Sequence, residues 1–313
     1  MKTRENCAEL SNFIEEIASF IDRERIIEEA PMDRYTSFRA GGKASVLVIV
    51  ENVEELKKLL KAVKATSLNS LFLGSGSNIL IKDSGFSGVV IKLGEGFNTI
   101  TVEGEEVTAL AGAKLSSVAR AALDNSLAGF EFASGIPGSI GGGIFMNAGA
   151  YGGELKDIVV SVNALSVDGE REYTLTGEEL KFGYRHSIFH DSKDIVLSAT
   201  FKLEKGNAEE IDATMRELME KRNTKQPVQL PSAGSFFKRP EGHFAGKLVE
   251  DAGLKGLSVG QAQVSPLHAG FIVNNGGATA TEIVELMHLV QNTVYDKFGV
   301  KLEPEVRIIG DEE

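Results

Sequence analysis

The chain has 313 residues, of which 42% are hydrophobic and 25% charged, and a formal net charge of -12 at pH 7. This length allows two domains with a sizeable core. The negative charge argues against nucleic acid as the main partner. No stretch approaches the roughly 20 apolar residues that span a bilayer, and the N-terminus lacks the apolar core of a signal peptide. We therefore expect a cytoplasmic protein that binds neither nucleic acid nor a membrane. Cys7 is the single cysteine, which excludes an intrachain disulfide.

The first half of the chain alternates helical and strand patterns. Apolar residues at helical spacing predict an amphipathic helix from Ala8 to about Glu29. A strand is expected over 44–50, followed by a helix to about residue 64 that Asn52 caps, with Glu55 as its capping-box partner. Strands are expected over 71–73, 79–81 and 89–92, then a hairpin over 99–111 that turns at Gly104, and a helix over 115–125.

The second half begins with a glycine-dense segment, 129–153, which we expect to be irregular. Strands are predicted over 158–166, 171–175 and 195–203. A polar break at 205–207 is the candidate domain boundary, and a helix follows over 208–223. A long helix is expected over 279–298, capped by Thr279 or Thr281, with a last strand over 305–309. We expect an α+β fold with domains at 1–204 and 205–313, and with the last strand packing back on the first domain.

The first glycine loop reads Leu73-Gly-Ser-Gly-Ser-Asn78. Consecutive backbone N–H groups of such a loop can bind an anion. It is not a Rossmann fingerprint, because Ile79 stands where that motif has Gly or Ala and the following residues are β-like, whereas the motif opens a helix. Taken alone, the loop is equally consistent with a tight turn.

The second glycine loop runs from Ser134 to Gly153 and includes the sequence GIPGSIGGG followed by NAGAYGG. So many glycines make folding costly in chain entropy. That cost is understandable where the backbone must approach a flat or phosphorylated ligand closely. Its apolar residues, among them Ile136 and Phe145, argue against a solvated surface loop.

The two loops together resemble the FAD-binding domain of the vanillyl-alcohol-oxidase-type flavoproteins, and the segment Tyr35–Gly42 resembles the N-terminal T-x-F-x-x-G-G motif of its MurB members. The resemblance implies an FAD-binding domain in two subdomains and a smaller α/β substrate domain. All five histidines lie at 186 or later and Cys7 lies far upstream, so we expect non-covalent FAD. The implied FAD contacts are Gly74, Ser75, Gly76, Ser77, Asn78, Gly135, Gly138, Ser139, Gly142, Asn147 and Ala150.

Three further segments resemble signatures of the MurB family, the UDP-N-acetylenolpyruvoylglucosamine reductases. They are FGYRHSIF at 182–189, SAGSFFKRP at 232–240 and LEPEVR at 302–307. They occur in the family's order and at similar spacing. No tyrosine lies between Tyr184 and Tyr295, so the chain resembles the shorter type that lacks a substrate-covering tyrosine loop.

The resemblance assigns three catalytic residues. Reduction of an enolpyruvyl ether adds a hydride to one vinyl carbon and a proton to the other. Arg185 is expected to stabilise the negative charge that spreads onto the substrate carboxylate, because its planar fork matches a carboxylate. Glu305 would assist it, which for a donor requires a retained proton. Ser235 would supply the proton. Without the resemblance, each reads as an ordinary surface, turn or strand residue.

Four residues are expected to contact the substrate or the nicotinamide: Tyr184, Arg222, Lys225 and Lys238. No histidine has carboxylates at metal-ligand spacing, so no metal is expected. The implied activity is NADPH-dependent reduction of UDP-N-acetylglucosamine enolpyruvate to UDP-N-acetylmuramate in peptidoglycan synthesis, with hydride passing through FAD and NADPH leaving before the UDP-sugar binds. We expect a monomer. The alternatives are an oxygen-using flavin oxidase of the same fold and a non-catalytic nucleotide-sugar binding protein.

Overall fold

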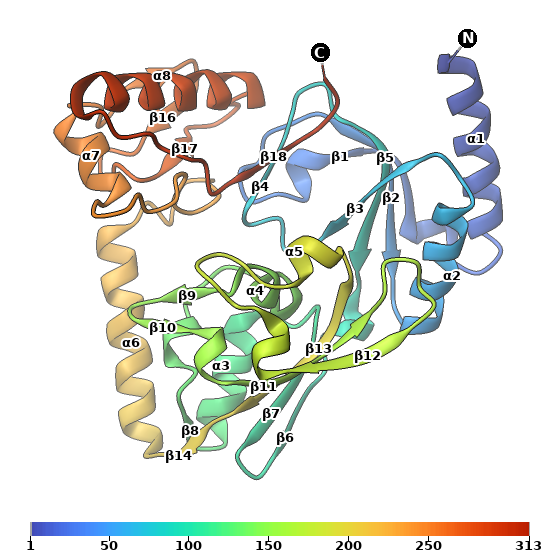
Figure 1. Cartoon of the computed structure of the whole chain (residues 1–313), viewed down its shortest axis with the longest axis horizontal. Helices are drawn as coiled ribbons and strands as arrows, with labels where there is room; N and C mark the ends of the chain where they lie inside the picture. The colour runs from blue at the N-terminus through green and yellow to red at the C-terminus, as the bar shows by residue number, and fades with distance from the viewer. Residues whose placement is uncertain (1, 313) are drawn as a thin grey trace. The chain divides into compact units, whose positions relative to one another are not determined.

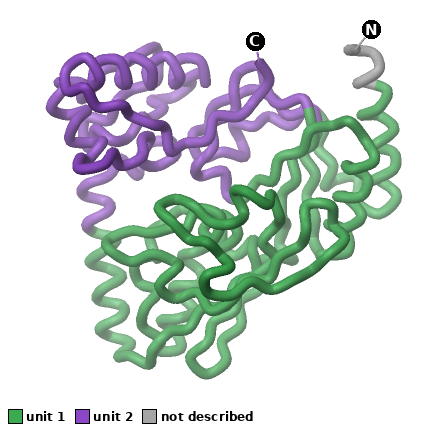
Figure 2. Tube along the Cα trace, viewed as in Figure 1, with its two compact units in different colours: residues 1–28, 46–74, 88–220 green, residues 29–45, 75–87, 221–313 purple. Residues whose placement is uncertain are grey.

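The computed structural model describes residues 2–312, with side chains from residue 8 onward. The side chain of Cys7 therefore lies outside the described part. The chain forms two compact units (Figure 2): unit 1 comprises residues 1–28, 46–74 and 88–220, and unit 2 comprises residues 29–45, 75–87 and 221–313. Each unit is thus assembled from segments that are far apart in the sequence. The predicted domains 1–204 and 205–313 stay a prediction.

Unit 1 holds most of the regular structure (Figure 1). Its α-helices are α1 (Lys2–Ile17), α2 (Val53–Lys64), α3 (Leu115–Asp124), α4 (Ile140–Met146), α5 (Phe189–Ser192) and most of α6 (Ala208–Lys225). Its short 3-10 helices are η1 (Arg23–Arg25), η3 (Glu95–Phe97), η4 (Glu131–Ala133), η5 (Leu155–Asp157) and η6 (Gly177–Leu180).

Two sheets organise unit 1. The first has the order β1-β2-β5-β3, from strands β1 (Ile26–Pro31), β2 (Lys43–Val50), β5 (Phe86–Leu93) and β3 (Asn69–Leu73), and the unit boundaries fall within β1, β2 and β5. The second is antiparallel with the order β12-β11-β13-β7-β6, from β12 (Glu172–Thr176), β11 (Val159–Leu165), β13 (Ile195–Lys202), β7 (Glu106–Leu110) and β6 (Ile100–Glu103). Short pairs add β8 (Leu127–Ala128) to β14 (Glu204–Lys205), and β9 (Gly149–Ala150) to β10 (Gly153–Glu154).

The predicted N-terminal helix is wrong in its second half. Helix α1 ends at Ile17, and the chain then turns through η1 into strand β1 from Ile26. The apolar residues beyond the helix, including Phe20 and Ile21, still contact the same core as α2 and β2. Their spacing therefore reflected burial against a shared core, which a turn and a strand satisfy as well as a helix does.

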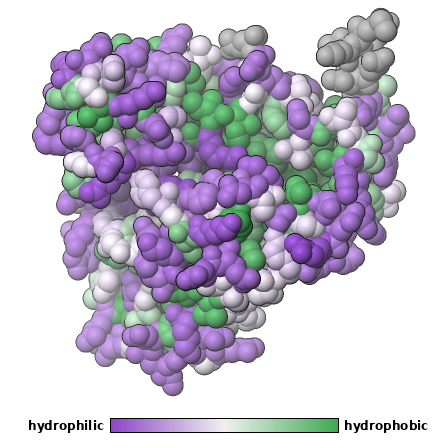
Figure 3. Space-filling model, in the orientation of Figure 1, coloured by the Kyte–Doolittle hydropathy of each residue, from purple (hydrophilic) through white to green (hydrophobic). Residues whose placement is uncertain are grey.

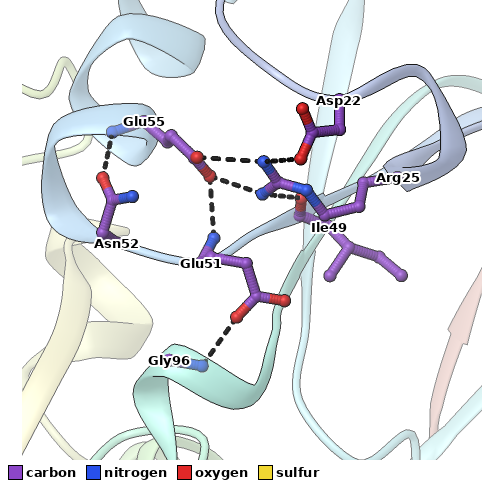
Figure 4. A network of polar contacts seen from close by, with 7 residues as sticks. All are labelled: Asp22, Arg25, Ile49, Glu51, Asn52, Glu55 and Gly96. Carbon is purple, nitrogen blue, oxygen red and sulfur yellow. Dashed lines mark hydrogen bonds and ion pairs between the residues drawn. The ribbon is translucent and has the colours of Figure 1, made fainter.

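Helix α2 begins as predicted, but Glu55 does not close a capping box. Asn52 caps the helix by accepting a 2.9 Å hydrogen bond from the Glu55 amide. The Glu55 carboxylate accepts instead from the Glu51 amide at 2.9 Å and from both terminal nitrogens of Arg25 at 2.6 and 3.0 Å (Figure 4). The Arg25 guanidinium lowers the pKa of Glu55 despite the opposing effect of burial. This bidentate pair joins the turn after α1 to α2.

Unit 2 is built around the long helix α8 (Ala280–Phe298). Its other elements are η2 (Met32–Arg34), β4 (Ile79–Ile81), α7 (Ala245–Asp251), β15 (Ser258–Val259), β16 (Ala262–Val264), β17 (Ile272–Asn274) and β18 (Arg307–Ile309). Strands β15, β16 and β17 form an antiparallel sheet, and the last strand, β18, pairs in parallel with β4. The apolar face of α8 shares one core with Phe38, Leu80 and Phe236, so distant segments of the chain meet there.

Hydrophilic residues cover most of the face shown in Figure 3. Among the described residues, no helix is long and apolar enough to cross a membrane.

Asp83 completes the N-terminus of α8 from a segment nearly two hundred residues away. Its carboxylate accepts from the amides of Ala280 and Thr281 at 2.9 and 2.8 Å and from the Thr281 hydroxyl at 2.7 Å. Thr279, one of the two caps that the sequence predicted, caps the next amide, and the structure adds a capping box with Glu282. Burial works to raise the pKa of Asp83, but the bonds from Thr281 and Ala280 outweigh it and lower the pKa.

Replacing Asp83 with alanine should lower the free energy of unfolding by about 1–2 kcal/mol, as loss of a helix cap does. Because the folded-state pKa is depressed, the contribution is fully present above the ordinary value of 3.8 and is lost as the pH falls through the folded pKa. Denaturant titrations of wild type and variant from neutral to acidic pH test this. Glu285→Ala, an exposed acid within α8, is the control and should show no such pH-dependent difference. Equal stability of wild type and Asp83→Ala at neutral pH would contradict the prediction.

Candidate cofactor and substrate site

Gly74, where the first glycine loop begins, meets the second loop within unit 1. A Cβ added to Gly74, at the end of β3, would lie 2.9 Å from the Ser139 hydroxyl oxygen and 4.0 Å from the Gly142 backbone. The segment 129–153 is less irregular than predicted, because residues 140–146 form helix α4. Gly141 and Gly143 serve this helix: a Cβ there would lie 3.1 Å from Ala111 and 3.0 Å from Leu155. These two glycines thus permit close packing of a short helix.

The rest of the first loop, 75–78, lies in unit 2 against the Tyr35–Gly42 segment. Gly76 has φ +64°, and a Cβ on it would lie 2.2 Å from the carbonyl oxygen of Tyr35. The Ser37 amide donates to the Gly76 carbonyl at 3.0 Å. The strand β4 that follows confirms that this loop does not open a helix.

The segments that carry Ser235 and Glu305 are hydrogen-bonded neighbours in unit 2. The Glu305 amide donates to the Phe236 carbonyl at 2.8 Å, and Phe237 forms a β-bridge with Pro304. The Asn78 side chain donates to the Glu305 carbonyl at 3.2 Å. Ser235 is exposed and is followed by the buried Phe236, and Glu305 is half-buried. Unit 2 therefore brings together the first loop, the Tyr35–Gly42 segment and two of the three predicted catalytic residues.

Arg185 lies in unit 1, in a turn next to the second loop. The turn is closed by two backbone hydrogen bonds between Gly183 and His186, at 3.0 and 3.3 Å. Arg185 has φ +53°, its guanidinium carbon lies 5.1 Å from the Tyr184 ring centroid, and it makes a long 3.5 Å hydrogen bond to the Gly149 carbonyl. Tyr184 is 50% exposed, so its ring is accessible to a ligand.

The predicted substrate-binding cations lie at the end of α6 and beside Glu303. Arg222 and Lys225 occupy the last turn of α6. Lys238 forms a 3.4 Å ion pair with Glu303, and both side chains are exposed. No group of three or more potential metal ligands occurs among the His, Cys, Asp and Glu residues in the described part.

Within each unit taken by itself, the residues around the glycine loops suit the polar atoms of an FAD. Among the described side chains, the hydroxyls of Thr36 and Ser134 are buried and have no hydrogen-bond partner. A buried hydroxyl without a partner costs free energy, so each is suited to a polar ligand atom. Thr36 lies against Gly76 and Ser134 immediately precedes Gly135 of the second loop. Lys92, whose ammonium donates to the Gly74 carbonyl at 3.1 Å and whose pKa is lowered by burial, adds a cation there.

Sequence reasoning did not select Thr36, Ser134 or Lys92 as individual site residues. Thr36 and Ser134 stand inside segments that had been singled out, but only their burial without partners distinguishes them from other hydroxyl residues. Nothing in the sequence around Lys92 marks it as a site residue. Asn147 was expected to contact FAD, yet its side chain is fully buried and its amide is bonded to other protein groups.

Two family profiles match the chain. Residues 44–174 match the "FAD binding domain", and residues 226–309 match the "UDP-N-acetylenolpyruvoylglucosamine reductase, C-terminal domain". These two segments contain both glycine loops and the Ser235 and Glu305 segments.

Relatives match over nearly the full length. The UDP-N-acetylenolpyruvoylglucosamine reductase of Alkaliphilus oremlandii is 48% identical over 296 residues, which are 95% of this chain and 97% of the relative. That of Clostridioides difficile has the same identity and coverage. The crystal structure of the Thermus caldophilus enzyme (MurB) superposes with a TM-score of 0.78 at 37% identity, covering 90% of this chain and 97% of that one. The expected α+β fold with a vanillyl-alcohol-oxidase-type FAD-binding domain is confirmed.

Proposed function

This chain belongs to the UDP-N-acetylenolpyruvoylglucosamine reductase (MurB) family, and from that premise we propose that it uses NADPH to convert the enolpyruvyl UDP-sugar into UDP-N-acetylmuramate. The protein is a flavin-binding oxidoreductase of peptidoglycan synthesis. The observation that carries the proposal is the hydrogen-bonded assembly of the Ser235 and Glu305 segments with the first glycine loop in unit 2. The cytoplasmic location and the monomeric state stay predictions.

The glycine loops would hold the cofactor without a covalent bond. The loop Gly74–Asn78 would bind its pyrophosphate through backbone N–H groups. Gly135, Gly138, Ser139, Gly142 and Ala150 of the second loop, with the buried hydroxyl of Ser134 beside them, would contact the rest of it. Bound FAD would supply the redox chemistry, taking a hydride from NADPH and giving it to the enolpyruvyl double bond.

Three side chains would stabilise and protonate the reacting substrate. Arg185 would bind the substrate carboxylate, onto which negative charge spreads as the double bond is reduced; fixed donors aimed at developing charge are an effective source of rate enhancement. Glu305 would assist Arg185 at the reacting substrate. The Ser235 hydroxyl would give its proton to the second vinyl carbon, which completes the addition of one hydride and one proton.

Four further residues would contact the substrates. Tyr184, half exposed beside Arg185, presents an aromatic face to the sugar or the nicotinamide. Arg222, Lys225 and Lys238 would neutralise phosphate charge on the UDP group or on NADPH.

The direct test is a mixture of the purified protein, NADPH and UDP-N-acetylglucosamine enolpyruvate. We expect a yellow protein that consumes NADPH in proportion to the acceptor and forms UDP-N-acetylmuramate, detected by mass spectrometry. The control omits the acceptor in air and under nitrogen. Equal NADPH consumption in air without acceptor would indicate the oxidase alternative, and a colourless protein that binds the UDP-sugar without consuming NADPH would indicate a binding protein.

A further inference from the structure

Asn147 connects three segments of unit 1 through one buried amide. It follows α4 with φ +44° and is 0% exposed. Its nitrogen donates to the Glu154 carboxylate and to the Gly183 carbonyl, both at 3.0 Å, and its oxygen accepts from the Lys156 amide at 3.0 Å. A fully buried amide is stable only when its donors and acceptor are paired, and this one is paired with three separate groups. Its side chain therefore has no exposed atom left for a cofactor.

One of these groups belongs to the turn that carries Arg185. Arg185 has φ +53° at the third position of this turn, where a glycine is normally preferred. Such a conformation costs a non-glycine residue on the order of 1 kcal/mol or more and persists only when its surroundings hold it. Two part-buried hydrogen bonds do so: Asn147 to the Gly183 carbonyl, and the Ser187 hydroxyl to the Phe145 carbonyl at 2.8 Å. The turn is thus held at each end.

A second group, Glu154, acts on the charge of Arg185. Its carboxylate accepts from the Lys156 ammonium at 2.7 Å and from Asn147. The Lys156 hydrogen bond is the largest cause of its lowered pKa, and the Asn147 bond and the charge of Arg185 lower it further against the effect of burial. Glu154 is also the cross-strand partner of Gly149, whose carbonyl accepts from Arg185. An ionised carboxylate therefore attracts the guanidinium on the side of the second glycine loop.

We propose that Asn147 is a positioning residue for Arg185, tying both the 183–186 turn and the Glu154 carboxylate to the end of α4 through one buried amide. The proposal rests on the proposed function, in which Arg185 acts on the carboxylate of the substrate. The proposal predicts different effects on the two half-reactions, which are the reduction of the flavin and the reduction of the substrate. Reduction of the flavin by NADPH involves no substrate carboxylate, whereas reduction of the enolpyruvyl group does, so displacement of Arg185 affects the second step selectively.

Two substitutions at Asn147 distinguish the role of its side-chain amide from the role of its left-handed backbone conformation. Asn147→Gly keeps the left-handed conformation that glycine adopts freely and removes all three bonds. Asn147→Asp keeps an acceptor for the Lys156 amide but places an acceptor against the Gly183 carbonyl and the Glu154 carboxylate. We expect both to slow enolpyruvyl reduction at least about tenfold, since small displacements of catalytic groups have large effects. Flavin reduction by NADPH should stay within about twofold of wild type.

A second readout needs neither cofactor nor substrate. In the apo protein, hydrogen exchange at the amides of residues 183–187 should be at least about tenfold faster in both variants, because the turn has lost a buried tether. Ser187→Ala, which removes the other tether, should show the same pattern and serves if an Asn147 variant does not fold. Asn163→Ala is the matched control: its amide bonds to Ser198 and Thr174 in the same unit, and its loss should change neither exchange at 183–187 nor either half-reaction.

Three results would overturn the proposal. Hydrogen exchange at residues 183–187 at the wild-type rate in the Asn147 variants would show that the Asn147 side-chain amide does not hold the turn. Fast exchange with an unchanged rate of enolpyruvyl reduction would show that the turn does not position Arg185. Equal losses in both half-reactions would point to cofactor binding in place of substrate chemistry. If wild type itself fails to reduce the enolpyruvyl sugar, the proposed function fails, while the exchange experiment on the apo protein still decides whether Asn147 tethers the turn.

Discussion

Ser235→Ala should reduce its flavin with NADPH at the wild-type rate and lose turnover of the enolpyruvyl substrate by at least about a hundredfold, the scale of general acid catalysis. The variant removes a single hydroxyl from an exposed position, and the buried neighbours Phe236 and Phe237 keep the segment in place. The fold and the bond from the Glu305 amide to the Phe236 carbonyl should therefore persist. Anaerobic rapid mixing follows flavin bleaching by NADPH, then its recovery when the enolpyruvyl sugar is added.

The control for this variant is Ser258→Ala, which truncates another exposed serine of unit 2, in strand β15. It should behave like wild type in both half-reactions. Recovery of the reduced flavin at the wild-type rate in Ser235→Ala would show that another group supplies the proton. Slow bleaching by NADPH together with slow recovery would show that the hydroxyl acts on the flavin or on its site, and the assignment as proton donor would again be wrong.

Gly76→Ala should abolish tight FAD binding and lower the melting temperature of unit 2. Its φ of +64° disfavours any side chain, and the new Cβ would lie 2.2 Å from the Tyr35 carbonyl oxygen and 2.9 Å from the Thr36 Cα. Both are backbone atoms that cannot rotate away, so the first loop and the Tyr35–Gly42 segment must separate. That movement displaces the buried Thr36 hydroxyl as well as the loop amides. We expect FAD affinity at least about a hundredfold weaker, a loss of about 3 kcal/mol.

Gly104→Ala is the matched control, because it tests the effect of a positive φ on an alanine without a close contact. Gly104 turns the β6–β7 hairpin with φ +63°, and no atom lies within 4 Å of a Cβ placed there. It should lose on the order of 1 kcal/mol of stability and keep its FAD. Flavin content after purification and a fluorescence titration of the apo protein with FAD measure the difference. Equal FAD affinity in the two alanine variants would mean that close approach at Gly76 is not what the loop requires.

Local patterns predicted most elements correctly because their causes are local. The β6–β7 hairpin turns at Gly104, and Thr279, one of two expected caps, caps α8, as the turn and capping residues alone indicated. The failures came where burial imitated a local pattern or overrode one. Residues 20–21 continue the apolar spacing of α1 but lie beyond its end, and residues 140–146 form a helix although three of the seven are glycine. There, packing against the rest of unit 1 outweighs intrinsic propensity.

The sequence by itself determined the family, the two glycine loops and the segments that carry Arg185, Ser235 and Glu305. Each of these is a run of consecutive residue types, which can be recognised without knowledge of the fold. Only the tertiary structure decided which groups those segments meet. Hydrogen bonds from Asn78 to Glu305 and from Asn147 to Gly183 join residues far apart in the chain. The buried, unpaired state of the Thr36 and Ser134 hydroxyls also depends on neighbours that are distant in the chain. Such partnerships follow from three-dimensional packing, whereas composition and spacing report only what lies along the chain.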